Sequence, residues 1–186
     1  MKNKSNYNVE LHEADSKKII IINGPATSGK DTFVKIFQEK YPSINFSCVD
    51  SIKKIAKEIG WDGTKSDKDR KFLSDLKILT SEYNDFSFNN TLNIIKEFAS
   101  SSDKEKYLFI HMREAKDIER TKRAANIIGL KVVTLLLTNK NVKHNTSNVA
   151  DANVFDYSYD YHVKNDGTID DLKNIVDEFY QEIQKI

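Results

Sequence analysis

The stretch Gly24-Pro25-Ala26-Thr27-Ser28-Gly29-Lys30-Asp31-Thr32 decides how the rest of the chain is interpreted. Four consecutive isoleucines at 19–22 precede it, and such a run is typical of a strand buried on both faces. Apolar residues at i, i+3 and i+4 follow it, which predicts an amphipathic helix that runs to about residue 40. A glycine-rich loop between a buried strand and a helix is the place of a phosphate-binding loop.

The residue types in this loop suit an anionic ligand. Gly24 and Gly29 allow backbone conformations and close approaches that a Cβ atom would forbid. Successive loop N–H groups and the start of the following helix converge on an anion, and Lys30 reaches the outer phosphates as a point charge. We therefore expect nucleotide contacts from Gly24, Ala26, Thr27, Ser28, Gly29, Lys30, Asp31 and Thr32. The competing interpretation is a glycine-rich turn that binds nothing.

One position departs from the usual pattern. The motif G-x-x-x-x-G-K-[ST] has a hydroxyl directly after the lysine, where this chain has Asp31. The nearest hydroxyl is Thr32, expected to contact an inner phosphate. Asp31 either orients a magnesium ion through water or is simply an acidic residue in the first turn of the helix. Both residues are candidate metal ligands.

Strands and helices alternate along the rest of the chain. Further strands are predicted at 44–49, 107–111, 131–137 and 159–163, and helices from Asp50 to Gly60 and at 67–83, 89–100, 114–128 and 169–183. This order predicts one three-layer α/β domain over residues 17–186, with a five-stranded parallel sheet between helices. Residues 1–16 are expected to be a polar, flexible tail.

Composition excludes several classes of protein. Among 186 residues, 29 Lys and Arg face 28 Asp and Glu, and a net charge of +1 gives no bulk attraction to nucleic acid or to a membrane. The single Cys48 excludes an internal disulfide framework and a multi-cysteine metal site. No apolar stretch is long enough to span a bilayer, and the amino-terminal residues lack the apolar region of a secretory signal. We expect a cytoplasmic protein.

Beyond the loop, several segments resemble one family. The run Ser28-Gly29-Lys30-Asp31-Thr32 resembles the loop of bacteriophage and bacterial deoxynucleoside monophosphate kinases. Weaker similarities are Asp50-Ser51-Ile52-Lys53, Ile59-Gly60-Trp61-Asp62-Gly63, Asp69-Arg70 and Asn165-Asp166-Gly167-Thr168. The resemblance covers roughly residues 18–184. It implies a P-loop kinase fold, ATP and Mg²⁺, and a (deoxy)nucleoside monophosphate as phosphoryl acceptor.

The acceptor side has four candidate residues. Asp50 and Lys53 follow the second predicted strand, and ligands of open α/β sheets bind beyond the carboxyl ends of the strands. In relatives an Asp-x-x-Arg pair on this helix holds the acceptor phosphate, so Lys53 would be the cation here. The alternative is a helix-capping Asp50 beside a solvated Lys53. The resemblance also implies that Arg113 binds phosphate and takes part in catalysis, and that Arg70, from a helical region at about 50–102, holds the same phosphate or makes a surface ion pair.

The remaining candidates are more ambiguous. Glu114 either helps to hold magnesium or is an acid at a helix start. His111 either faces the site or belongs to the core, and Trp61 either stacks on a base or packs on its own helix. Arg120 and Arg123 are expected on a solvated helix face. Three acidic or amide residues near the fifth strand border the adenine or form a turn: Asp151, Asn153 and Asp156.

The loop at about 138–150 corresponds to the lid of such kinases. It contains Lys140, Lys143 and His144 but no arginine, and lysine lacks the bidentate fork that arginine offers to phosphate. The resulting hypothesis is a kinase of the nucleoside monophosphate type, with small-molecule nucleotides as partners. The alternatives are a kinase for another phosphate, such as phosphomevalonate, and a nucleotide-binding protein with little catalysis. The sequence also leaves open the possibility of a homodimer.

Overall fold

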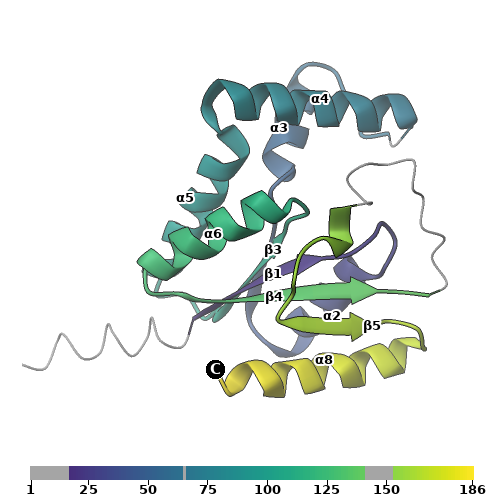
Figure 1. Cartoon of the computed structure of the whole chain (residues 1–186), viewed down its shortest axis with the longest axis vertical. Helices are drawn as coiled ribbons and strands as arrows, with labels where there is room; N and C mark the ends of the chain where they lie inside the picture. Colours follow the sequence, from purple (N-terminus) through teal and green to yellow (C-terminus); the bar gives the residue numbers. More distant parts are fainter. Residues whose placement is uncertain (1–16, 65, 141–152) are drawn as a thin grey trace, which may run out of the picture.

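The structure is a computed structural model that describes residues 17–64, 66–140 and 153–186 (Figure 1). The predicted tail and most of the predicted lid loop, with Lys143, His144 and Asp151, lie outside these ranges. The strands are β1 (Lys18–Asn23), β2 (Ser43–Ser47), β3 (Tyr107–His111), β4 (Lys131–Thr138) and β5 (Tyr161–Lys164). The helices are α2 (Lys30–Lys40), α3 (Asp50–Glu58), α4 (Asp67–Asn84), α5 (Phe86–Ser100), α6 (Ala115–Ile127) and α8 (Ile169–Gln184), with a 3-10 turn η1 (Asn153–Phe155).

The five strands form one parallel sheet in the order β2-β3-β1-β4-β5. The central strand β1 lies between β3 and β4, and all six of its residues are buried. This burial explains the isoleucine run, because helices cover both faces of the strand. The predicted α/β class and the parallel sheet are confirmed.

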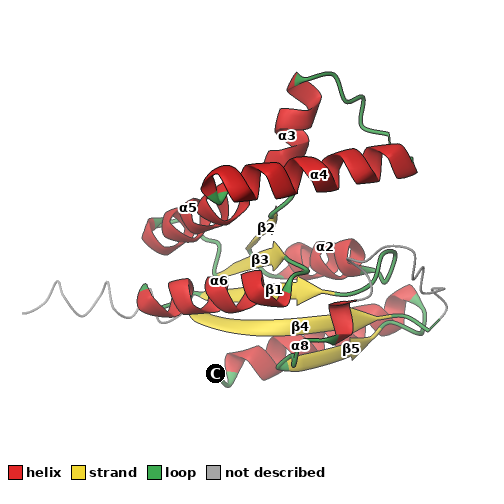
Figure 2. Ribbon diagram, turned by 45° about the horizontal axis from the view of Figure 1, so that its top comes forward, coloured by secondary structure: helices red, strands yellow, loops and turns green. Residues whose placement is uncertain are grey.

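Helices lie on both sides of the sheet (Figure 2), and two apolar clusters fill the space between them and the strands. On one face, Phe33 and Phe37 of α2 pack with Phe179 of α8 against alternate residues of the strands. On the other face, Phe98 of α5 and Ile118 of α6 pack against the intervening strand residues. The strands therefore lie in the middle layer of three.

Helices α3 and α4 stand off from the sheet, above its β2–β3 side (Figures 1 and 2). None of the side chains of α4 is fully buried, and Leu79 is 64% exposed. The sharp bend to α5 occurs at Asp85, which has a left-handed backbone with φ 57°. Because this single residue links the two helices, α5 begins at Phe86 rather than at the predicted residue 89.

Two strands differ from their predicted limits. The second was predicted to reach residue 49 but ends at Ser47, because Val49 already accepts the first hydrogen bond of α3 from the N–H of Lys53. The fifth was predicted from residue 159 but begins at Tyr161. The carboxylate of Asp160 accepts hydrogen bonds from the N–H and the hydroxyl of Thr134, both at 2.8 Å, where strand pairing would otherwise begin.

Across the described ranges, no helix combines the length and the apolar character needed to cross a membrane.

Candidate active site

The loop between β1 and α2 needs glycine at both glycine positions of the motif. Gly24 has φ 151°, and a Cβ atom there would lie 2.1 Å from the carbonyl oxygen of Leu137. Gly29 has φ 100°, and its Cβ atom would lie 2.3 Å from Nδ2 of Asn165. The predicted need for close approach is confirmed, and the close neighbours are β4 and the loop after β5.

Lys30 is the first residue of α2, and its side chain lies across the loop. Its Nζ donates to the carbonyl oxygens of Gly24 at 2.6 Å and Pro25 at 2.7 Å. A cavity of about 220 Å³ opens over the start of the helix, where loop N–H groups and the helix dipole favour an anion. Five of the predicted loop residues line it: Thr27, Gly29, Lys30, Asp31 and Thr32.

The described residues contain no group of three or more His, Cys, Asp or Glu side chains that could hold a metal ion by themselves. One carboxylate, that of Asp31, lines the cavity, and it is 97% exposed. This donor set fits Mg²⁺, which keeps several waters and is bound by one or two carboxylates together with substrate phosphates. Asp31 and Thr32 would hold the ion with a nucleotide. Glu114 is the residue before the first turn of α6 and is half-buried.

Asn23 at the end of β1 connects the loop to two other segments. Its Oδ1 accepts from the N–H of Gly24 at 2.8 Å, and its Nδ2 donates to the carbonyl oxygen of Arg113 at 3.1 Å and to the hydroxyl of Tyr159 at 2.6 Å. The side chain is almost fully buried. Asn23 therefore fixes the start of the loop relative to the segment after β3.

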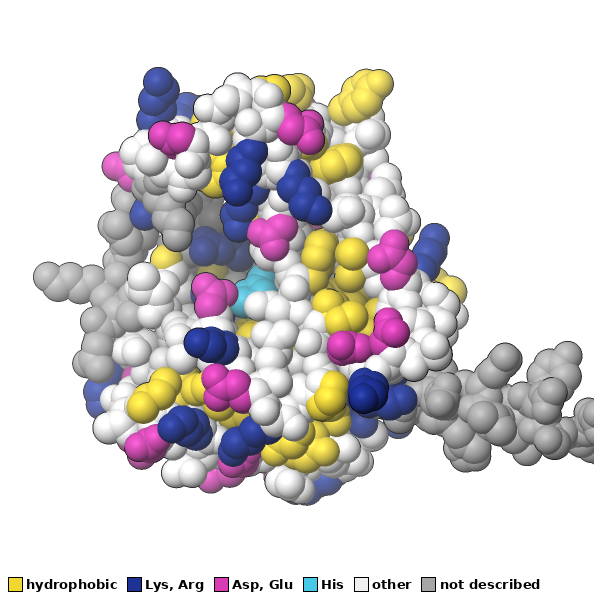
Figure 3. All heavy atoms as spheres, turned by 180° about the vertical axis from the view of Figure 1, so that it is seen from behind, with side chains coloured by type: hydrophobic (Ala, Val, Ile, Leu, Met, Phe, Trp, Pro, Cys, Tyr) yellow, Lys and Arg dark blue, Asp and Glu magenta, His cyan; other side chains and the backbone are white. Residues whose placement is uncertain are grey.

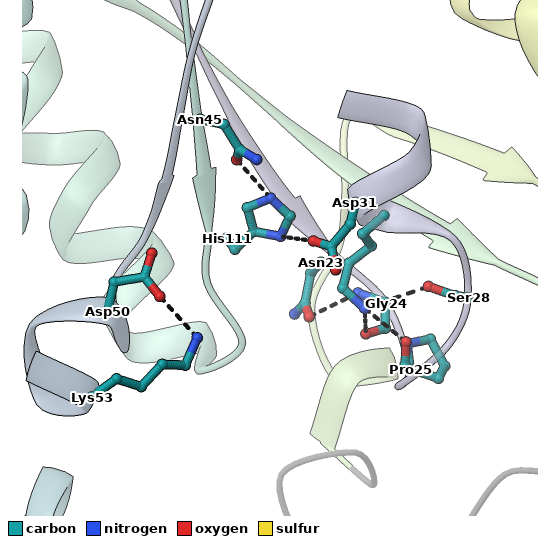
Figure 4. A network of polar contacts seen from close by, with 10 residues as sticks. Asn23, Gly24, Pro25, Ser28, Asp31, Asn45, Asp50, Lys53 and His111 are labelled. Carbon is teal, nitrogen blue, oxygen red and sulfur yellow. Dashed lines mark hydrogen bonds and ion pairs between the residues drawn. The ribbon is translucent and has the colours of Figure 1, made fainter. Parts of the chain in front are cut away.

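A second cavity of about 170 Å³ adjoins the loop. It lies at the carboxyl ends of β2 and β3, between the starts of α2 and α3 (Figure 4). Its lining is entirely polar: Asp31, Asn45, Ser47, Asp50, Lys53 and His111. Asp31 lines both cavities, so a molecule in the second lies next to an anion held by the loop. The space-filling view shows a histidine side chain at the surface beside a hollow, with acidic and basic side chains around it (Figure 3).

The structure brings Asp50 and Lys53 together, but differently from the capping alternative. Val49 holds the N-cap position of α3, and no side chain caps this helix. The carboxylate of Asp50 instead accepts from Nζ of Lys53 at 2.8 Å, one turn along the helix. The possibility of a helix-capping Asp50 is therefore wrong, and both side chains line the second cavity.

His111 lies in the second cavity between Asn45 and Asp31. Its Nε2 lies 2.9 Å from Oδ1 of Asn45, and its Nδ1 lies 3.9 Å from Oδ1 of Asp31. Burial lowers the pKa of the imidazole below its usual value, although the carboxylate of Asp31 acts in the opposite direction. Between the two alternatives left open for His111, the structure places it in the cavity lining rather than in the core.

The arginines proposed as site residues lie outside the two cavities. Within the described residues, neither Arg70 nor Arg113 lines either cavity. Arg113 is half-buried just after β3, and Arg70 is exposed in the first turn of α4. The prediction of a solvated face is wrong for Arg120, which forms a bidentate ion pair with Asp85 and stacks on Phe88.

Two of the remaining candidate residues make hydrogen bonds in the structure. Nε1 of Trp61 donates to the carbonyl oxygen of Thr64 within its own turn. The N–H of Lys140, at the start of the predicted lid loop, donates to Asp166 at 2.7 Å. Asp156 is exposed after η1.

Sequence reasoning missed Asn45 and Ser47 as site residues. The signal was present, because the second strand reads Ser43-Ile44-Asn45-Phe46-Ser47 with polar residues at every second position. Alternation places these residues on one face of the strand, while Ile44 and Phe46 pack into the cluster on the other face. An edge strand covered on one side leaves its polar face for a ligand.

No family model matches the chain, and no curated protein is similar to it in sequence. Solved structures do share its fold. The Deinococcus radiodurans tunicamycin resistance protein aligns with a TM-score of 0.57 at 15% identity, covering 90% of this chain and 95% of the other. The Mycobacterium tuberculosis APS kinase in complex with AMPPNP and APS aligns with a TM-score of 0.50 at 11% identity, covering 90% and 99%. The chain therefore shares the fold of these two proteins.

Proposed function

We propose that this protein is an ATP-dependent phosphotransferase that acts on a small-molecule acceptor. The observation that carries this proposal is the pair of adjoining cavities that share Asp31. One lies over a phosphate-binding loop and the other lies at the carboxyl ends of β2 and β3, where an open α/β sheet binds its ligands. The kinases that share the fold support the same class of reaction.

The donor side needs little covalent chemistry from the protein. Phosphoryl transfer depends mainly on positioning and on neutralising charge. The loop N–H groups and the start of α2 would hold the donor phosphates, and Lys30 would turn from its two carbonyl partners to the outer phosphates. Mg²⁺ bound with the nucleotide would supply further charge neutralisation.

For the acceptor we propose a (deoxy)nucleoside monophosphate, the class that the sequence resemblance implies. An oxygen of the acceptor phosphate would attack the γ-phosphorus, and the bond to the ADP oxygen would break. No general base is required, because a phosphate monoester is already an anion at neutral pH. Lys53 lines the second cavity, and Arg113 and Arg70 are the arginines proposed to contact the phosphate.

The test is ADP release from Mg-ATP with each ribo- and deoxynucleoside monophosphate in turn. Lys30→Ala should lower the acceptor-dependent rate by about 100-fold or more, because the outer phosphates lose their cation. Lys35→Ala is the matched control, since Lys35 is exposed on the same helix and should leave the rate within about twofold.

Other outcomes identify the alternatives. Release driven only by a non-nucleotide phosphate such as phosphomevalonate would keep the phosphotransferase and replace its acceptor. Tight ATP binding without acceptor-dependent release would indicate a nucleotide-binding protein with little catalysis.

A further inference from the structure

The charges and hydrogen-bonding groups that line the second cavity favour some ligand groups over others. Its only cation among the described residues is Lys53, and that ammonium is already paired with Asp50 at 2.8 Å. Two carboxylates, those of Asp31 and Asp50, face the same space. Lys30 is close enough to lower the pKa of His111, but it lies on the loop side, where the donor phosphates bind.

This balance does not suit a phosphate dianion as the occupant of the cavity. A phosphate monoester offers only hydrogen-bond acceptors and negative charge, and like charges close together repel. Carboxylates, an amide and a hydroxyl instead match a group that both donates and accepts hydrogen bonds. A hydroxyl is the smallest group of this kind.

Asn45 and His111 provide a matched pair of atoms for such a group. Oδ1 of Asn45 lies 2.9 Å from Nε2 of His111, and in the tautomer that carries its proton on Nε2 these two atoms satisfy each other. The amide nitrogen of Asn45 points away from the ring in Figure 4 and can donate to a ligand. Nδ1 of His111 is directed toward Asp31, on the side where the two cavities meet.

We propose that Asn45 and His111 recognise a sugar hydroxyl of the acceptor, and that the second cavity holds the sugar rather than the phosphate. This inference rests on the proposed function and names the feature that the site selects. The acceptor is then a molecule with a hydroxylated ring or chain next to its phosphate. The phosphate itself lies on the side of the cavity that adjoins the loop, next to the donor phosphates that Lys30 and the start of α2 hold.

The test is equilibrium binding, by calorimetry, of ribo-, 2′-deoxy- and 2′,3′-dideoxynucleoside 5′-monophosphates to the full-length protein without ATP. A site that hydrogen-bonds a hydroxyl rejects the analogue that lacks it. We expect removal of one hydroxyl to weaken binding by about 10-fold or more. Asn45→Ala should bring this ratio close to one while changing the affinity for the analogue by less than about threefold.

Three further variants complete the design. His111→Ala should also reduce the ratio, and Asn45→Gln, which keeps the amide, should retain part of it. Asn93→Ala is the matched control, because Asn93 is exposed on α5 and should leave every affinity unchanged. Circular dichroism and urea unfolding of each variant separate lost recognition from lost folding.

The outcomes separate this inference from the proposed function. If the variants lower all affinities equally and leave the ratio unchanged, or if no member of the series binds, the inference is overturned. If binding discriminates as expected but no acceptor drives ADP release, hydroxyl recognition stands and the phosphotransferase proposal fails. If ADP release depends on the acceptor but not on its hydroxyls, only the present inference fails.

Discussion

Both carboxylate oxygens of Asp85 are bound by the two terminal nitrogens of Arg120, at 3.1 and 2.7 Å. Asp85 is the left-handed residue at the bend between α4 and α5, and Arg120 comes from α6. The guanidinium also lies 3.9 Å from the ring centre of Phe88, in the first turn of α5. The Arg120 side chain therefore holds the bend between α4 and α5 against α6, the helix that follows β3.

Arg120→Ala should therefore destabilise the fold more than a surface arginine substitution does. The cation–π contact with Phe88 alone contributes about 0.5–1 kcal/mol, and the bidentate ion pair adds to it. Urea unfolding measures the change. Arg123→Ala is the control, because Arg123 is exposed on the same helix and should stay within about 0.5 kcal/mol of the wild type. Equal effects of the two substitutions would show that the Asp85 contact does not stabilise the bend.

Gly24→Ala should be much more destabilising than Gly60→Ala. Both glycines have positive φ, 151° and 101°, so both substitutions cost backbone strain of about 1–2 kcal/mol. Only Gly24 also has backbone in the way, since its Cβ atom would lie 2.1 Å from the Leu137 oxygen, whereas nothing lies within 4 Å at Gly60. We expect a difference of about 2 kcal/mol or more in the free energy of unfolding. A similar loss at both positions would contradict the close approach of the loop to β4.

Protonation of His111 should lower the free energy of unfolding at mildly acidic pH. Its pKa is lowered in the folded state by burial, so the unfolded chain binds a proton more readily below the ordinary histidine pKa of about 6.5. Stability then rises with pH through this window and falls as the pH drops from 7.5 to 5.5. Unfolding at both pH values should show a smaller loss for His111→Asn than for the wild type. His162→Asn, at an exposed position of β5, should keep the wild-type loss.

The loop and the sheet were predictable because each rests on contiguous residues. The isoleucine run predicts the central strand, and the spacing from Gly24 to Lys30 predicts the anion-binding turn. Fold class follows from the alternation of such segments. These inferences need no knowledge of which segments meet in space.

The second cavity could not be predicted in this way, because it depends on which segments meet in space. Asn45 and His111 are 66 residues apart, and they become neighbours only because β2 pairs with β3 in the register Ser47↔His111. Arg120 reads as a solvated helix residue until the bend at Asp85 is placed opposite it. A pattern in a single sequence predicts which face of a helix or strand is apolar. It does not predict which other element packs against that face, and the second cavity is formed by residues of several elements.

Asn23→Ala should be among the most damaging single changes near the loop. The substitution leaves the N–H of Gly24 and the carbonyl oxygen of Arg113 without the partner that Asn23 supplies, at a position 1% exposed. Each unsatisfied buried group costs about 1–3 kcal/mol, so we expect a total of about 2–6 kcal/mol by urea unfolding, together with weaker ATP binding. Tyr159→Phe removes one of the three bonds of Asn23 and also the bond that the tyrosine hydroxyl donates to the carbonyl oxygen of Val154, so it should cost about 1–3 kcal/mol, without loss of ATP affinity. If the tyrosine variant weakened ATP binding as much as Asn23→Ala does, the Tyr159 hydroxyl rather than the bond to Gly24 would position the loop, and Asn23 would lose its role in positioning Gly24.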